Sequence, residues 1–142
     1  MGVHGVRLPQ EVFVFVRRDD EFLVLHRSPE QGAYWHCVAG ALEPGESFAE
    51  AAARELREET GLVAVPVDLR RSYQYDIEGW EPHFRPGADR VVVECFLVEA
   101  PAGWEPALDW EHDAYRWCPG DEAAALLYWP EAREVLRELA VQ

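Results

Sequence analysis

The chain has 142 residues, the size of one domain with one core, and 49% of them are hydrophobic, which excludes a disordered chain. Its formal net charge of −14 at pH 7 disfavours binding to DNA or RNA polymers, because the average field repels a polyanion. A small phosphorylated substrate stays compatible with this charge if divalent cations mask the carboxylates around it. We therefore expect one domain over residues 1–142 and no nucleic-acid polymer as a partner.

Three cysteines, Cys37, Cys95 and Cys118, are widely separated and match no zinc-binding spacing, and their odd number argues against a disulfide framework. This usage indicates buried thiols in a reducing compartment. The amino-terminal residues lack the apolar centre of a signal peptide, and the apolar runs are only as long as strands. The sequence therefore predicts a cytoplasmic protein without a membrane partner, either a monomer or a homodimer.

The first half of the chain shows two strand-like runs and then one strong helix. Residues 11–16 and 22–26 are apolar and are separated by four polar residues, which predicts a hairpin. Residues 35–40 predict another short strand, followed by a loop with Gly and Pro. Ser47 and Glu50 then form the pattern of a capping box, and the helix is expected over residues 48–60. A glycine at position 61 stands where a left-handed C-cap belongs.

The second half mixes strands and helices. In chain order we expect strands at 63–69 and 72–77, a loop at 79–87, a central apolar strand at 90–98, a short strand at 114–117, a helix from 120 or 121 to 127, and a last helix from Pro130 to about 140. The elements do not alternate as regular βαβ units. The sequence therefore predicts an α/β (α+β) fold with a mixed β-sheet sandwiched between helices.

The helix at residues 48–60 carries a cluster of glutamates. Glu55, Glu58 and Glu59 gather on one side, and like charges this close destabilise an isolated helix. Arg54 compensates part of this charge, and bound divalent cations would compensate more, because Mg²⁺ selects carboxylate oxygens. Taken alone, these carboxylates are more typical of a solvated acidic face. The side that packs on the sheet is expected to comprise Ala49, Ala52, Ala53, Leu56 and Thr60.

The loop before the helix changes this interpretation, because residues 43–46 add a carboxylate close to the helix start in a loop held by turn chemistry. Loop and helix together resemble the Nudix box, G-x5-E-x7-R-E-U-x-E-E-x-G-U, in which U is a bulky aliphatic residue. Its fixed positions are matched by Gly40, Glu46, Arg54, Glu55, Leu56, Glu58, Glu59, Gly61 and Leu62. A departure is Val38-Ala39, where many members have Pro-Gly, although Ala39 still offers a main-chain carbonyl.

The resemblance implies a hydrolase that uses Mg²⁺ or Mn²⁺ to cut a phosphoanhydride bond in a nucleoside-diphosphate-like small molecule, releasing pyrophosphate from a nucleoside or pterin triphosphate. The metal-site residues that it implies are Ala39, Glu46, Glu55, Glu58 and Glu59. Glu55 and Glu59 would be the principal ligands, and Glu58 would be a further ligand or would orient water. Arg54 would brace the glutamates, and Glu46 would fix the loop or help to hold a second metal through water.

Several residues outside the box are candidates for the same site, each with an alternative role. Glu111 is either a further ligand or general base, or a structural residue, whereas His112 is more typical of a surface or packing residue than of a catalyst. Glu94 either lines the site or faces solvent. Trp35 or Trp80 could stack on a ring base. The candidate phosphate clamps, which could equally be surface ion-pair partners, are Arg27, Arg85 and Arg90.

The segments at 34–40, 84–90 and 111–117 also resemble the Nudix subgroup that hydrolyses dihydroneopterin triphosphate, and the last of them resembles diadenosine polyphosphate hydrolases as well. A non-catalytic nucleotide-binding regulatory module on the same fold would show degraded box glutamates, and none is degraded here. Isomerases of isopentenyl diphosphate that share the fold usually alter the box and use a cysteine, so Cys37 and Cys95 leave that class only barely open. An RNA-decapping role is disfavoured because the chain is acidic.

Overall fold

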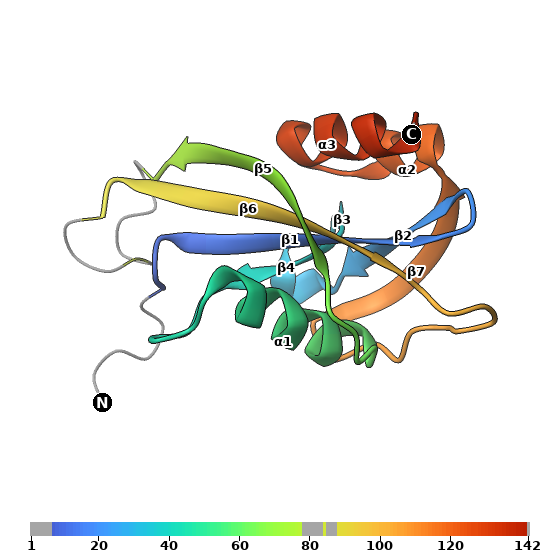
Figure 1. Cartoon of the computed structure of the whole chain (residues 1–142), viewed down its shortest axis with the longest axis horizontal. Helices are drawn as coiled ribbons and strands as arrows, with labels where there is room; N and C mark the ends of the chain where they lie inside the picture. Colours follow the sequence, from blue (N-terminus) through green and yellow to red (C-terminus); the bar gives the residue numbers. More distant parts are fainter. Residues whose placement is uncertain (1–6, 78–83, 85–87, 142) are drawn as a thin grey trace.

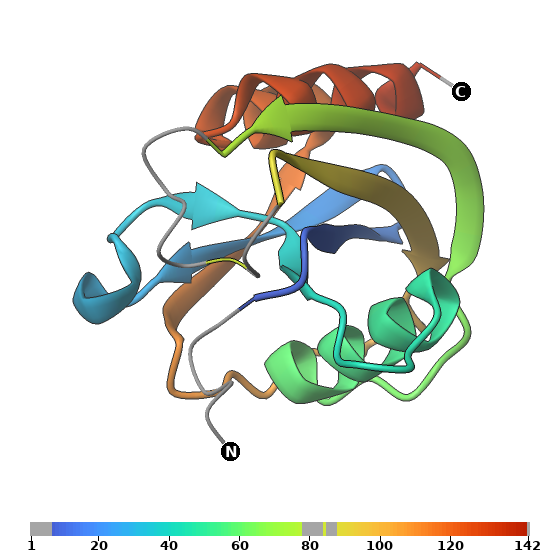
Figure 2. The same ribbon diagram turned by 90° about the vertical axis from the view of Figure 1, so that its left-hand side faces the viewer.

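A computed structural model describes residues 7–77, 84 and 88–141, and in these residues seven strands form one sheet that separates the first helix from the last two (Figures 1 and 2). The elements in chain order are β1 (Gln10–Arg18), β2 (Glu21–Arg27), the 3-10 helix η1 (Pro29–Gln31), β3 (Trp35–His36), β4 (Val38–Ala41), α1 (Phe48–Thr60), β5 (Val67–Asp76), β6 (Arg90–Glu99), β7 (His112–Pro119), α2 (Gly120–Leu126) and α3 (Pro130–Ala140). None of the described helices is long and apolar enough to span a membrane.

The sheet is mixed, as the sequence predicts. Its order is β3-β2-β1-β6-β5, with β4 paired to β1 and β7 paired to β2. The β1–β6 pair is parallel, whereas the β1–β2, β1–β4, β2–β7 and β5–β6 pairs are antiparallel. β1 therefore has β6 on one edge and shares its other edge between β4 and β2, which places β4 directly beside the centre of the sheet.

Each face of the sheet is one wall of a hydrophobic core. Because side chains alternate along a strand, Val12 and Val14 of β1 lie in the core that includes α1, whereas Phe13 and Phe15 lie in the core that includes α2 and α3. Figures 1 and 2 show the same layering, with α1 on one side of the strands and α2 and α3 on the other. The expectation of a sheet sandwiched between helices is confirmed.

Most of the predicted elements are confirmed, and the differences have physical causes. The run at 35–40 is two short strands that part at Cys37, and β7 starts two residues before the predicted short strand. The strand expected at 63–69 is wrong over its first half, where Val63 and Val65 are 81% and 87% exposed and precede Pro66. β-Branched residues favour strands, but a proline has no amide hydrogen to donate to a neighbouring strand. Apart from Phe84, the predicted loop at 79–87 lies outside the described residues.

Local signals define both ends of α1. The Ser47 hydroxyl accepts a hydrogen bond from the Glu50 amide at 3.1 Å, and the Ser47 amide donates to the Glu50 carboxylate at 2.9 Å. Gly61 ends the helix in the left-handed region with φ of 82°, and its amide donates to the Arg57 carbonyl. These contacts confirm the capping box and the glycine C-cap, so the helix that carries the glutamates starts and stops where the sequence requires.

The buried face of α1 differs from the predicted one. Ala52, Leu56 and Thr60 are buried as expected, but Ala49 is exposed and Ala53 is only half-buried. The buried set is Ala51, Ala52, Glu55, Leu56, Glu59 and Thr60. The helix is thus rotated so that two of its glutamates face β4 rather than water. The hydrophobic periodicity of the sequence does not predict this rotation, because it assigns charged residues to the solvent-facing side of a helix.

The three cysteines are free and buried, as predicted, and burial raises the pKa of all three thiols.

His36, on β3, is a buried histidine. His36 is 4% exposed, and its ring lies edge-on to the ring of Phe13, with 4.7 Å between the ring centroids. Burial, together with the charges of Arg27 and His112, lowers the pKa of His36 from 6.5 to about 3.

This histidine makes a prediction for acid stability. Above pH 6.5 neither state binds the proton; between pH 6.5 and about 3 only the unfolded chain binds it, so His36 destabilises the fold as the pH falls. The free energy of unfolding should therefore decrease by an extra ~1.4 kcal/mol per pH unit, which His36→Phe should remove. Urea unfolding of both proteins at several pH values measures the two slopes. Equal slopes would show that His36 titrates normally in the folded protein.

Candidate active site

Gly40 of β4 lies directly against the carboxyl group of Glu55. A Cβ atom at position 40 would be 2.3 Å from Cδ of Glu55 and 2.5 Å from both of its oxygens. No side chain fits in this space, so only glycine lets the carboxyl group approach the β4 backbone. Gly40 is also paired with Val12 of β1, which holds its backbone in the sheet. The first glycine of the motif is therefore explained by a close approach rather than by a turn.

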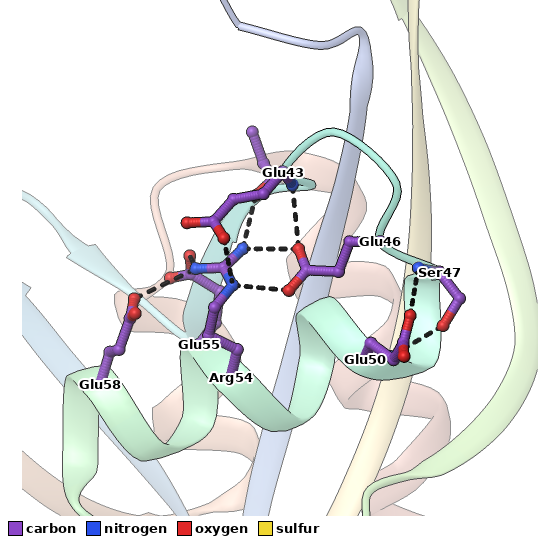
Figure 3. A network of polar contacts seen from close by, with 8 residues as sticks. Glu43, Glu46, Ser47, Glu50, Arg54, Glu55 and Glu58 are labelled. Carbon is purple, nitrogen blue, oxygen red and sulfur yellow. Dashed lines mark hydrogen bonds and ion pairs between the residues drawn. The ribbon is translucent and has the colours of Figure 1, made fainter.

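Arg54 binds three of the motif glutamates at once (Figure 3). Its Nε and Nη2 donate to the two oxygens of Glu46 at 2.7 and 2.9 Å, and its Nη1 donates to Glu55 at 2.6 Å and to Glu58 at 3.1 Å. Nη2 also donates to the carbonyl of Ala41 on β4 at 3.0 Å. A planar guanidinium is suited to such a fork. The hydrogen bond to Glu46, and then the contacts with Glu55, raise the pKa of Arg54 above its usual value.

Glu46 holds the loop that precedes α1. Its Oε1 accepts from the amide of Glu43 at 2.9 Å, which closes the loop from within, and both of its oxygens accept from Arg54 (Figure 3). The bonds from Arg54 lower the pKa of the Glu46 carboxyl below its ordinary value. Glu46 is therefore a charged residue that joins the loop to the helix.

Glu55 and Glu59 are buried next to each other, one turn apart, whereas the side chain of Glu58 is 49% exposed. Glu59 is only 2% exposed and accepts from the amide of Ala39 at 3.4 Å. Burial raises the pKa of both carboxyls, and for Glu59 the neighbouring Glu55 raises it further. Glu55 has Arg54 as a partner, but Arg54 does not reach Glu59, so ionising both carboxyls leaves more negative charge than the protein neutralises around them.

This arrangement fits a hard divalent cation. Two carboxylates beside a strand backbone offer only oxygen atoms, which Mg²⁺ and Mn²⁺ prefer, and the cation would offset the charge that Arg54 leaves. In the described part of the chain, no three His, Cys, Asp or Glu side chains are already gathered as a complete ligand set. Mg²⁺ takes one or two carboxylates and keeps several waters for exchange with phosphate oxygens.

The segment that ends at β7 brings two further residues to the buried carboxylates. His112 is buried, with Nδ1 2.8 Å from Oδ1 of Asp109 and Nε2 3.7 Å from Oε1 of Glu59. The sequence favours a surface or packing role for His112 and does not point to Asp109. The only signal for them is the Asp-x-x-His spacing beside Glu111.

Glu111 itself is half-buried, and its main-chain carbonyl accepts from the amide of Ser28 at 2.8 Å. Glu94 also lies near this region of the sheet. It is opposite Val12, which is in turn opposite Gly40, and strand alternation puts its half-buried side chain on the α1 face with Phe96. This position favours the first of its two predicted roles, a carboxylate that lines the site.

The candidate substrate-binding residues lie on other elements. Arg27, at the end of β2, donates to the carbonyl and the side chain of Gln31 at 3.1 and 2.9 Å, so its guanidinium is already engaged. Trp35 of β3 lies edge-on to His26 with 5.0 Å between ring centroids. Arg90 is exposed at the start of β6. Arg85 and Trp80 lie outside the described residues. The structure thus gathers the box residues, whereas Arg27, Trp35 and Arg90 lie on β2, β3 and β6.

Known proteins similar to this chain agree with the site. A family model described as the NUDIX domain matches residues 7–139. The asymmetrical bis(5'-nucleosyl)-tetraphosphatase of Sus scrofa is 32% identical over 121 residues, 83% of this chain and 77% of that protein. The solved structure of the E. coli dihydroneopterin triphosphate pyrophosphohydrolase has a TM-score of 0.83 and 26% identity, covering 96% of this chain and 97% of that one.

A third relative is much longer. An octanoyltransferase of Myxococcus xanthus is 37% identical over 116 residues, which are 81% of this chain but 31% of that protein, so the chain spans about a third of its length. The family model, in contrast, covers nearly all of this chain, and the residues of the box are complete and gathered in space. The chain therefore belongs to the Nudix family of hydrolases.

Proposed function

We propose that this protein is a single-domain pyrophosphohydrolase that uses Mg²⁺ or Mn²⁺ to cut a phosphoanhydride bond in a nucleoside-diphosphate-like small molecule. The observation that carries this proposal is the buried pair Glu55–Glu59 beside β4, of which Arg54 neutralises only one member. Burying a carboxylate without a charged partner is unfavourable, and buried carboxyls with perturbed pKa values are typical of functional sites.

Each box residue then has a task. Glu55 and Glu59, with the carbonyl of Ala39, would hold the metal, and Glu46 would support a second one through water. When bound, the metal polarises phosphate oxygens and lowers the pKa of its water. Arg54 holds the carboxylates in place, as its hydrogen bonds indicate.

Two less buried carboxylates, Glu58 and Glu111, are the candidates for orienting and deprotonating the attacking water. Glu58 is half-exposed and touches Arg54 through one oxygen, so it can orient water at the site. Glu111 is the candidate general base, because it is adjacent in sequence to His112, and Nε2 of His112 lies 3.7 Å from Oε1 of Glu59. A general base must lie within hydrogen-bond reach of the attacking water.

Dihydroneopterin triphosphate is the proposed substrate, supported by the similarity of the whole chain to the E. coli enzyme. Arg27, Arg85 and Arg90 would then bind its phosphates and Trp35 its ring. The similarity to the Sus scrofa tetraphosphatase favours diadenosine polyphosphates as the second candidate.

A product assay with Mg²⁺ at alkaline pH distinguishes these substrates. It compares dihydroneopterin triphosphate, ordinary nucleoside triphosphates, diadenosine tetraphosphate and ADP-ribose at equal concentrations. We expect the highest kcat/KM for dihydroneopterin triphosphate, with pyrophosphate as product. A pterin rate no higher than that of nucleoside triphosphates would reject the pterin assignment, and no turnover of any compound would favour a regulatory nucleotide-binding module.

Replacing Gly40 should impair catalysis through the position of Glu55, in contrast to a glycine replacement that affects only stability. Gly40→Ala places a methyl group into the Glu55 carboxyl and should lower kcat by about a hundredfold, because small displacements at a reacting centre have effects of that size. Gly120→Ala is a matched control, since its Cβ would meet Ala140 at an equally short 2.3 Å on the α3 side. It should lower the melting temperature but not kcat of the folded protein. Wild-type kcat in Gly40→Ala would contradict the assigned role of Glu55.

A further inference from the structure

An aromatic cluster of Tyr34, Tyr128 and Trp129 lies beside β3 and is open to solvent. The rings of Tyr34 and Tyr128 are stacked, with 4.8 Å between their centroids and 28° between their planes. The ring of Trp129 lies edge-on to both, 4.9 Å from Tyr128 and 6.0 Å from Tyr34. Tyr128 is 57% exposed and Trp129 is 37% exposed. Exposed aromatic side chains that are gathered in one place are typical of a binding surface.

Tyr128 is held in place by its neighbours. It follows the buried Leu127, and its amide donates to the carbonyl of Trp35 on β3 at 3.1 Å. Tyr34 supports its ring and is itself packed against the backbone of Gly32, where a Cβ atom would lie 2.9 Å from Cε2 of Tyr34. One face of the Tyr128 ring therefore rests on Tyr34, and the large exposed fraction of Tyr128 leaves room for a second planar ring.

The neighbouring Trp35 is less open. Its ring lies edge-on to that of His26, with 5.0 Å between the centroids, and the guanidinium of Arg116 lies over it at 5.4 Å. Trp35 is half-buried, whereas Tyr128 is exposed. Of the two aromatic residues that this hydrogen bond joins, Tyr128 therefore offers the more accessible ring.

The aromatic cluster is continuous with the candidate active site. The guanidinium of Arg27, a candidate phosphate clamp, lies 5.5 Å from the centroid of the Tyr34 ring. Tyr34 also precedes Ala39 by five residues, which span no more than about 18 Å even when fully extended. The amide of Ala39 contacts Glu59. A substrate whose phosphates lie at Glu59 can therefore extend along β3, past Arg27, and bring its ring to the cluster.

We propose that Tyr128, supported by Tyr34, binds the heterocyclic ring of the substrate by stacking. The inference rests on the proposed function and deepens it, because it moves the main ring contact from Trp35 to Tyr128. Stacking on an aromatic side chain tolerates different rings, because every base has a π face. The cluster therefore selects a class of substrate, phosphoanhydrides that carry a planar heterocycle, over phosphoanhydrides without a ring.

Steady-state kinetics of the purified full chain test this role with those of dihydroneopterin triphosphate, ATP and diadenosine tetraphosphate that the wild type hydrolyses. Tyr128→Leu keeps an apolar side chain without an aromatic face, whereas Tyr128→Phe keeps the face and is the matched control. Inorganic tripolyphosphate, added as a competing ligand, probes the phosphate site alone because it has no ring. Size-exclusion chromatography of each protein measures its oligomeric state.

We expect KM to rise about tenfold or more in Tyr128→Leu at nearly unchanged kcat, because stacking away from the reacting phosphorus contributes equally to ground and transition states. The KM of Tyr128→Phe and the Ki of tripolyphosphate in both variants should stay at their wild-type values. Because Tyr128 is exposed, neither substitution should affect folding.

Three results would overturn the proposal. An unchanged KM in Tyr128→Leu would show that the ring does not stack there, and a changed oligomeric state in that variant would then identify the cluster as an interface between two copies of the chain. Equal increases in KM and in the Ki of tripolyphosphate would show that Tyr128 acts through the shape of the phosphate site. A wild type that hydrolyses none of the three substrates would overturn the proposed function together with this inference, and so differs from the first two results.

Discussion

Replacing Glu59 by glutamine is expected to lower kcat roughly a thousandfold or more while leaving the metal-free fold at least as stable. A bound metal supplies several kcal/mol of transition-state stabilisation, and each ~1.4 kcal/mol is a factor of ten in rate. The expected change in stability has the opposite sign to that of most substitutions of buried residues. Because burial raises the pKa of Glu59, its ionised form weakens the fold as the pH rises above the unfolded value, and glutamine removes that charge.

The measurement for Glu59→Gln has two parts. Steady-state kinetics should show the loss in kcat, and melting curves with and without Mg²⁺ should show that the variant has lost the stabilisation that the ion gives to the wild type. Glu134→Gln, an exposed glutamate of α3 on the opposite side of the sheet, is the control and should behave as wild type. A Glu59→Gln variant that melts much lower in metal-free buffer would mean that Glu59 holds the fold together instead.

Replacing Arg54 by methionine is expected to lower the free energy of unfolding by roughly 3 kcal/mol and to abolish turnover. The change leaves Glu55 buried without its guanidinium and releases Glu46 and the carbonyl of Ala41, and breaking a buried ion pair typically has an effect of that size. Arg54→Lys should recover only part of the loss, because an ammonium group cannot form the fork with Glu46.

Urea unfolding in metal-free buffer gives this free energy. Arg71→Met is the control, because Arg71 pairs with Glu134 and Glu138 on the surface, where such contacts are worth about 1 kcal/mol or less. If both arginine variants lose the same small amount, then the cluster around Arg54 is a surface network and the account of the box geometry is wrong.

The parts of the fold that the sequence predicts are those that depend on residues close to one another in the chain. The limits of α1 follow from Ser47, Glu50 and Gly61, which act within one turn of the helix ends. The fixed spacing of the box likewise predicts which glutamates gather around Arg54. Such features need no knowledge of the rest of the chain.

The parts that the sequence does not predict depend on distant neighbours. Ala51 is buried and Ala49 is exposed because α1 turns its glutamates towards β4, and no periodicity shows that. The contact of His112 with Glu59 joins residues 53 positions apart, as their numbers show, and appears only when β7 pairs with β2. Arg27 is predicted to be either a phosphate clamp or a surface ion-pair partner, and its hydrogen bonds to Gln31 could not be foreseen because they depend on the short helix η1.

The most direct test of the central claim is the rate of pyrophosphate release from dihydroneopterin triphosphate or a nucleoside triphosphate as a function of Mg²⁺ concentration, in wild type and in Glu59→Gln. We expect the wild-type rate to be absent in EDTA and to rise to saturation with Mg²⁺, and the rate of the variant to stay near background throughout. A wild-type rate that persists in EDTA, or a variant with the wild-type curve, would contradict the assignment of the buried glutamate pair as the metal centre of a hydrolase.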